Sequence, residues 1–274
     1  MLLLFLNSLF FLDPCLFAIF IDSLVDRVRN VGLGCYMKMT CFSILLYADD
    51  ILLLAPSVHS LQLLLRACED ELSCLDMRLN NKKSVCIRIG PRYKTDCCSL
   101  VTSDNCELRW CNDLRYLGVY VTSSSTFSCS FSHSKQSTYR AFNALFGRVG
   151  RATSADVIVQ LFKMKCLPVL YYGCEVCPLN KTVTRSLQYV VKSCFSKIFQ
   201  TRSDDVIADC MDNFNCLPVA EAISRRRRNF LLKLSQSDNF LCHICRSFAH
   251  IELWSTILYI HAFSYWCAHY FIFS

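Results

Sequence analysis

Two adjacent carboxylates, Asp49 and Asp50, are the residues of this sequence best suited to catalysis. They close the segment Tyr47-Ala48-Asp49-Asp50, which has apolar runs on both sides. Like charges this close in a partly dry site raise the pKa of one carboxyl, and a hard divalent cation relieves that repulsion. A pair of Mg²⁺ ions held by carboxylates serves nucleotidyl transfer, because one ion activates the attacking hydroxyl and the other binds the leaving pyrophosphate. The pattern favours such a site over a plain polar turn, in which Asp is also common.

The elements around the acid pair follow from hydrophobic periodicity. The apolar runs are typical of buried strands, which places the acid pair in the turn of a hairpin. A helix is predicted over 58–79, a strand over 83–90, a loop over 91–105, and a strand pair over 107–110 and 114–121. The inner face of the helix consists of Leu61, Leu64, Leu65, Cys68, Leu72 and Leu75.

Beyond a Ser- and Thr-rich linker at 122–126 the pattern is helical only. Helices are predicted near 132–149, 155–172, 183–200 and 218–235, with Pro168 kinking or ending the second. The sequence therefore predicts an α+β fold, in which an antiparallel sheet with helices is followed by an all-α region.

The basic charge is concentrated in this helical region. The chain of 274 residues has a formal net charge of +7, yet residues 129–249 carry 17 Lys and Arg against 8 Asp and Glu, and the remainder carries 12 against 14. The densest run is Arg225, Arg226, Arg227 and Arg228. Four consecutive helical residues point in all directions, so some must face solvent or a phosphate. Phosphate contact, a nuclear-localisation signal and a solvated helix face are the three interpretations.

Both ends are apolar. Residues 1–21 have no basic residue before the apolar run, which argues against a secretory signal, and Asp13-Pro14 interrupts them as a membrane span. Residues 254–274 carry no formal charge and are about long enough to span a bilayer. A packed or disordered appendage is the alternative for this tail.

The 20 cysteines are scattered, which favours reduced thiols in an intracellular protein of the nucleus or cytoplasm, with no disulfide partner implied. Two Cys-x-x-Cys pairs, Cys174/Cys177 and Cys242/Cys245, could in principle hold zinc. Their separation exceeds the usual finger spacing, so chance pairs in a cysteine-rich chain are the favoured interpretation.

The segment LLYADDILLLAPS resembles the signature hairpin of the reverse transcriptase palm in non-LTR (LINE-type) retrotransposons. Three further segments resemble the later palm motifs in the same order: LQLLLRACEDELSCLDMRLNNKKS, VCIRIG and DLRYLGVYV. The segment LFAIFIDSLVDRV resembles an upstream helix of the family, and the basic helices to about residue 249 resemble its thumb. The resemblance implies an RNA template, a DNA primer, deoxynucleoside triphosphates and Mg²⁺. It implies Asp49 and Asp50 as metal ligands, and nucleic-acid contact by Tyr47 and by Leu117 and Gly118 of the primer-grip strand.

The chain departs from the family in its upstream part. The family places a further metal-binding Asp in a strand ahead of a glycine motif, and no residue here matches that Asp: Asp22 and Asp26 follow the motif, and Asp13 lies in the unmatched leader. The segment 7–12 lacks the glycines of that motif, and the fingers are not matched. Two-metal catalysis needs both ions bound, so we expect no polymerisation by this polypeptide alone.

These patterns predict four segments: an apolar leader of unclear role at 1–14, a partial palm at 15–123, a thumb-like region at 124–249 and an apolar aromatic tail at 250–274. The first hypothesis is a catalytically incomplete fragment of an RNA-directed DNA polymerase. The second is a non-catalytic nucleic-acid-binding remnant, and the third is a membrane-associated protein that uses its apolar ends.

Overall fold

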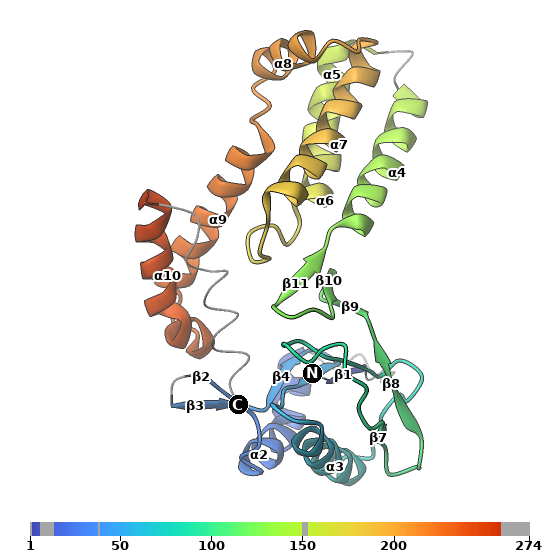
Figure 1. Cartoon of the computed structure of the whole chain (residues 1–274), viewed down its shortest axis with the longest axis vertical. Coiled ribbons are helices and arrows are strands. Elements are labelled where there is room, and N and C mark those ends of the chain that lie inside the picture. Colours follow the sequence, from blue (N-terminus) through green and yellow to red (C-terminus); the bar gives the residue numbers. More distant parts are fainter. Residues whose placement is uncertain (1, 6–13, 38, 150–152, 259–274) are drawn as a thin grey trace. The chain divides into compact units, whose positions relative to one another are not determined.

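The chain divides into two compact units, which are described separately (Figure 1). The computed structural model describes residues 2–5, 14–37, 39–149 and 153–258. Of the described residues, those within 2–115 and 121–128 form unit 1, and those within 116–120 and 129–258 form unit 2. The segments of the predicted leader and tail at 6–13 and 259–274 lie outside the described residues, and so does Asp13.

Unit 1 is built on a six-stranded sheet of order β4-β5-β1-β6-β8-β7. All its described pairs are antiparallel except β6 with β8, which is parallel. The strands are β1 (Leu2–Phe5), β4 (Ile44–Tyr47), β5 (Asp50–Leu53), β6 (Val85–Ile87), β7 (Leu100–Val101) and β8 (Glu107–Cys111).

The amino-terminal strand β1 occupies the centre of this sheet. It pairs with β5 on one side, where Leu2 faces Leu53 and Phe5 faces Asp50, and with β6 on the other. The order β6-β1-β5-β4, joined by helices after β1 and after β5, is that of a split βαβ or ferredoxin-like unit. Part of the apolar leader is therefore a structural strand.

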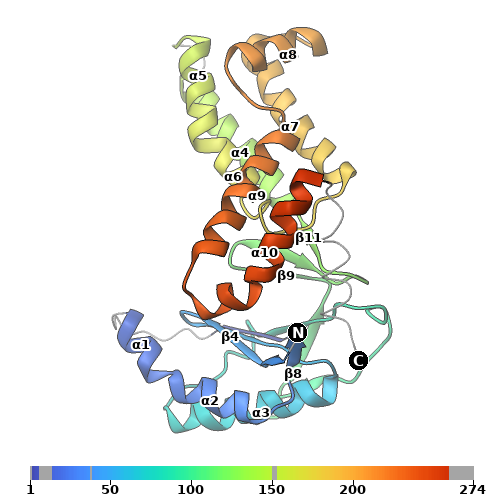
Figure 2. The same ribbon diagram turned by 90° about the vertical axis from the view of Figure 1, so that its left-hand side faces the viewer.

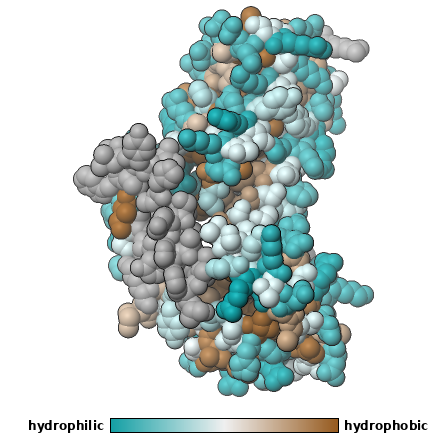
Figure 3. Space-filling model, viewed as in Figure 1, coloured by the Kyte–Doolittle hydropathy of each residue, from teal (hydrophilic) through white to brown (hydrophobic). Residues whose placement is uncertain are grey.

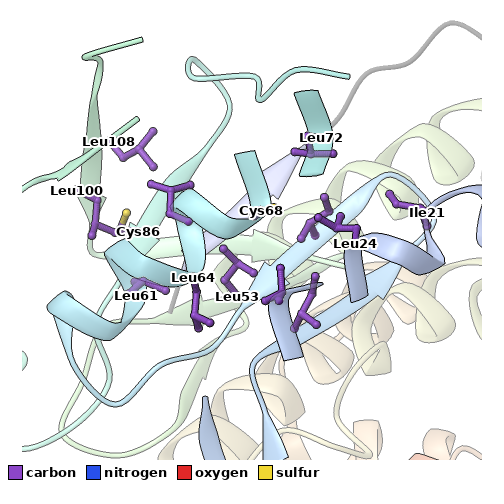
Figure 4. Close-up of a cluster of buried hydrophobic side chains, with 14 residues drawn as sticks. Ile21, Leu24, Leu53, Leu61, Leu64, Cys68, Leu72, Cys86, Leu100 and Leu108 are labelled. Atoms are coloured by element: carbon purple, nitrogen blue, oxygen red, sulfur yellow. The ribbon is translucent and has the colours of Figure 1, made fainter. Parts of the chain in front are cut away.

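Helices cover one face of the sheet (Figure 2). They are α2 (Asp22–Asn30) and α3 (Val58–Cys74), and α1 (Pro14–Phe20) precedes α2. The α3 face predicted from periodicity is buried from Leu61 to Leu72 and packs against the sheet and α2 (Figure 4). The helix ends earlier than the predicted residue 79, because Asp76 adopts the left-handed conformation at φ 53°.

Two smaller sheets contain the remaining described strands. The hairpin β2 (Cys35–Met37) with β3 (Thr40–Phe42) precedes β4. A three-stranded sheet of order β11-β10-β9 follows β8, and its strands are β9 (Asp113–Tyr116), β10 (Val119–Thr122) and β11 (Ser128–Ser130). The predicted strand over 114–121 is thus a hairpin, broken by a turn at Leu117 and Gly118.

Strand β7 lies inside the predicted loop 91–105, and the loop prediction is wrong at that point. The side chain of Gln62 on α3 donates to the Val101 carbonyl at 2.7 Å and accepts from the Val101 amide at 2.9 Å. Glu69, also on α3, accepts from the Ser103 amide at 3.0 Å. Helix side chains therefore satisfy backbone groups that the sequence pattern leaves unassigned.

Unit 2 is helical, as the sequence predicts, and its core contains Phe142, Phe162 and Phe195 in edge-to-face contact. Pro168 ends no helix, because a π-helical turn precedes it and accommodates the missing amide donor. Helices α8 and α10 were not predicted. The elements are α4 (Ser132–Val149), α5 (Ala155–Leu161), η1 (Phe162–Cys166), α6 (Leu167–Tyr171), α7 (Lys181–Phe199), α8 (Asp204–Asn213), α9 (Val219–Gln236) and α10 (Phe240–Leu258).

The predicted fold class is confirmed: a mixed helix-and-strand region precedes a run of helices. Within the described part of the chain, no helix has the length and apolar character needed to cross a bilayer. The rest of the tail that motivated the membrane hypothesis lies outside that part.

Candidate functional site

The acid pair lies at the tip of the β4–β5 hairpin. Tyr47 ends β4 and pairs with Asp50, the first residue of β5, so that Ala48 and Asp49 form a two-residue turn. The strand behind the turn is anchored, since Ile51 and Leu53 are fully buried in the helix-covered core. Successive strand residues alternate between faces, which places Asp50 on the sheet face opposite this core. The predicted hairpin is therefore present, with both carboxylates at its end.

The turn is conformationally strained at Ala48, whose φ is 50°. A left-handed conformation costs a residue with a Cβ about 1–2 kcal/mol. Such strain is found preferentially at binding and catalytic sites, where the surrounding structure maintains it. Here the buried β5 strand supplies that support and fixes where the Asp49 backbone lies.

The electrostatics of the tip favour a cation. Burial, followed by the charge of Asp49, raises the pKa of Asp50 above its ordinary value. A hard divalent ion bound between the two carboxylates would offset both causes. Tyr47, with 62% of its surface exposed, leaves the tip open on the β4 side.

Among the described residues, the strand positions paired with Asp50 add no further carboxylate. Across the strands, Asp50 faces Tyr47 on one side and Phe5 on the other. Over the ranges that the structure describes, no three His, Cys, Asp or Glu residues form a group that could hold a metal. Asp49 and Asp50 thus fit one end of a hard-cation site, which needs further oxygen ligands to be complete.

Leu117 and Gly118 form a second strained turn, which joins β9 to β10. Their φ angles are 46° and 81°, the signs of a type I′ hairpin turn, and Leu is an unusual choice at its first position. The Tyr172 hydroxyl donates to the Leu117 carbonyl at 2.8 Å. A Cβ on Gly118 would lie 2.9 Å from Cε1 of the Tyr172 ring, so only glycine fits there. Tyr172 is not among the predicted site residues, and its only signal in the sequence is the following glycine of a Tyr-Tyr-Gly turn.

The four arginines of α9 divide into two kinds. Arg225 and Arg228 are exposed, whereas Arg226 and Arg227 are half-buried. Arg226 contacts the Glu175 carboxylate at 2.9 Å, and Arg227 contacts Glu252. Two of the four predicted phosphate contacts are therefore engaged inside the unit.

Figure 3 shows hydrophilic side chains predominating over the α4, α5, α7 and α8 helices on the visible face of unit 2.

The two Cys-x-x-Cys pairs form no metal site in the described structure. Cys174 and Cys177 are buried in the turn after α6, while Cys242 and Cys245 lie on α10. Burial raises the pKa of the Cys174 thiol to about 12, whereas a hydrogen bond with Cys129 outweighs burial and lowers the pKa of the Cys177 thiol, so the thiolate that zinc requires is opposed at Cys174 but not at Cys177.

The acid-pair hairpin lies within a segment of known type. Residues 11–121 match the reverse transcriptase (RNA-dependent DNA polymerase) family. Among curated proteins, none matches the chain significantly. The matched segment contains Tyr47, Asp49, Asp50, Leu117 and Gly118, and it ends before the arginine run.

The match supports a polymerase-like fragment and confirms the coarse form of the predicted resemblance. Proteins of the reverse transcriptase family generally bind an RNA template, a DNA primer and deoxynucleoside triphosphates, and generally use Mg²⁺. The β1 strand precedes the matched residues, yet it supplies the strand next to the acid-pair hairpin. The helices after residue 121 lie outside the match.

Proposed function

We propose that this chain is a fragment of a non-LTR (LINE-type) retrotransposon reverse transcriptase, comprising the later part of the palm and a thumb-like helical region. The observation that carries the proposal is the acid pair on a strained two-residue turn, inside the segment that matches the reverse transcriptase family. Asp49 and Asp50 hold Mg²⁺ in this proposal. The ion supplies Lewis-acid activation of oxygen nucleophiles and neutralises phosphate charge.

The residues of the chain have separate tasks in this function. The buried Ile51 and Leu53 hold the hairpin rigid, so that Asp49 and Asp50 are oriented before the cation arrives. The exposed ring of Tyr47 lies beside them and offers a stacking surface for a base or sugar. The Leu117–Gly118 turn contacts the primer strand.

We further propose that the polypeptide does not polymerise alone. Beside the acid pair, the register positions are aromatic, and a two-ion site needs additional carboxylate oxygens. Losing one of the two ions from such a site removes the charge stabilisation of either the attacking or the leaving oxygen.

The test combines metal binding with primer extension on the purified chain. We expect Mn²⁺, as a probe for Mg²⁺, to bind and to be lost in Asp50→Asn, while Asp76→Asn in the same unit binds normally. We expect no template-dependent extension of a DNA primer on RNA with Mg²⁺ and deoxynucleotides. Extension that disappears on Asp49→Asn would overturn the proposed inactivity, and Mn²⁺ binding that Asp50→Asn leaves intact would overturn the site.

A second candidate function, non-catalytic nucleic-acid binding, is favoured by the exposed Arg225 and Arg228 in a region of net charge +9. Each phosphate contact makes the slope of log K against log salt more negative by about 0.9 for duplex DNA. We expect Arg225→Ala and Arg228→Ala each to weaken binding to an RNA–DNA hybrid and to make that slope shallower by about one contact. Lys233→Ala, a charge change on the same helix, serves as the control for net charge. Binding insensitive to salt, or equal effects of all three substitutions, would contradict contact by these arginines.

A further inference from the structure

The Leu117–Gly118 turn holds an apolar side chain in a conformation that leucine rarely adopts. Leu117 is 37% exposed, and its φ is positive. Two-residue hairpin turns of this kind usually contain Asn, Asp or Gly, because these residues tolerate the left-handed region. The intrinsic preference of Leu opposes this conformation, so contacts from outside the turn must maintain it.

Those contacts come from Tyr172 and Gly173, more than fifty residues later in the chain and in the same unit. The Tyr172 hydroxyl donates to the Leu117 carbonyl, and its ring occupies the space that a side chain at position 118 would need. The reverse contact also exists, since a Cβ on Gly173 would lie 2.8 Å from Cγ2 of Val119. Each glycine thus receives a side chain from the opposite segment, which fixes the two backbones against each other.

The segment that bears Tyr172 is itself fixed. Glu175 receives a hydrogen bond from Arg226 at 2.9 Å, and the same guanidinium lies 6.0 Å from the centroid of the Tyr171 ring. The Gly173 carbonyl accepts from the Cys177 amide at 3.0 Å, which closes the turn after α6. Position 172 is therefore anchored to α9 and is not a loose surface tyrosine, although 53% of its side-chain surface is exposed.

We propose that Tyr172 is a positioning residue, which holds the β9–β10 turn so that Leu117 contacts a nucleic-acid strand through its exposed apolar side chain. This inference rests on the proposed function. Tyr172 acts through the turn and does not touch the strand: its hydroxyl fixes the Leu117 carbonyl, and its ring excludes alternative conformations at Gly118. An aliphatic side chain on a rigid turn packs against the sugar or base face of a strand, and rigidity lowers the entropy cost of that contact.

The test is a double-mutant cycle on the full chain. Tyr172→Phe removes only the hydroxyl, and Leu117→Ala removes the contacting side chain. Binding of a labelled RNA–DNA hybrid is measured by fluorescence anisotropy, and exchange of the turn amides by hydrogen–deuterium exchange. We expect each single change to weaken binding by about three- to tenfold and Tyr172→Phe to speed exchange of the turn amides about tenfold, as for one lost hydrogen bond.

The decisive result is non-additivity. Once Leu117 is replaced by Ala, the further change Tyr172→Phe should weaken binding less than twofold, since the side chain that it positions is gone. Tyr189→Phe, at a tyrosine of the same unit that is 70% exposed, serves as the control and should change neither readout.

Three outcomes would overturn the inference. A wild-type chain that does not bind the hybrid removes the proposed function and the contact role together. If the wild-type chain binds the hybrid and the Tyr172→Phe variant binds it equally well, the positioning role alone is wrong. Additive losses in the double variant would show that Tyr172 affects binding independently of Leu117.

Discussion

Asp50 illustrates how one residue couples metal binding to pH. Its pKa is raised by burial and by Asp49, so ionised Asp50 destabilises the fold at pH values above that pKa, and the cost disappears as the pH falls through it. A bound cation instead stabilises the folded state at pH values above that pKa, because it binds the ionised carboxylate.

We therefore expect Mg²⁺ to raise the melting temperature at neutral pH and to lose this effect on acidification, at a higher pH than an ordinary Asp would give. Thermal melts with and without Mg²⁺ across a pH series measure it. Asp50→Asn should abolish both the Mg²⁺ shift and its pH dependence, whereas Asp76→Asn should keep them. A Mg²⁺ shift that survives in Asp50→Asn would mean that the cation binds elsewhere.

Residue identities in the candidate site were predictable where the signal is local. The pair Asp49 and Asp50 could be placed in a hairpin turn because its apolar flanks adjoin it in sequence. The different environments of Arg226 and Arg228 could not be predicted, because the carboxylate that engages Arg226 lies 51 residues away. Four identical residues in sequence therefore lie in two different environments.

At the scale of elements, side chains of α3 determine where a strand forms. Gln62 makes two hydrogen bonds to the backbone of Val101, on the side of β7 that has no neighbouring strand. An edge strand of two residues makes few backbone hydrogen bonds of its own, so the side-chain amide of Gln62 contributes a large share of the stability of β7.

We expect Gln62→Ala to reduce the hydrogen-exchange protection of the Val101 amide about tenfold, because its acceptor is removed. Protection of β5 and β6, further inside the sheet, should stay unchanged. Gln136→Ala, at an exposed position of α4, is the matched control for replacing Gln by Ala on a helix. Unchanged protection of Val101 would show that pairing with β8 alone maintains β7.

Element prediction failed wherever long-range contacts replaced a local signal. Period-3.6 patterns identified α3, α4, α7 and α9, since each helix buries one face. β7 depends on Gln62, which lies 39 residues away, and was assigned to a loop. Helix α10 was not predicted, and the boundary placed at residue 250 assigns its second half to a separate tail, although Glu252 on it pairs with Arg227.

At the scale of the whole molecule, the class of the fold was predictable and the composition of its central sheet was not. The change from alternating strands and helices to helices alone is visible in the sequence, and the structure confirms it. The position of β1 could not be predicted, because four apolar residues suit many environments and their partners lie about 50 and 80 residues later.

That position of β1 has a consequence for synthesis. The strand leaves the ribosome before both of its partners, and the second of them, Val85–Ile87, follows roughly 80 residues later, which corresponds to roughly 4–16 s of translation. During that interval the uncharged Leu-Leu-Leu-Phe segment lacks its β6 partner, so one of its edges stays unpaired even after β5 emerges. The nascent chain is therefore most vulnerable to misassociation before β6 emerges, and slower translation of residues 6–84 should lower the yield of folded protein.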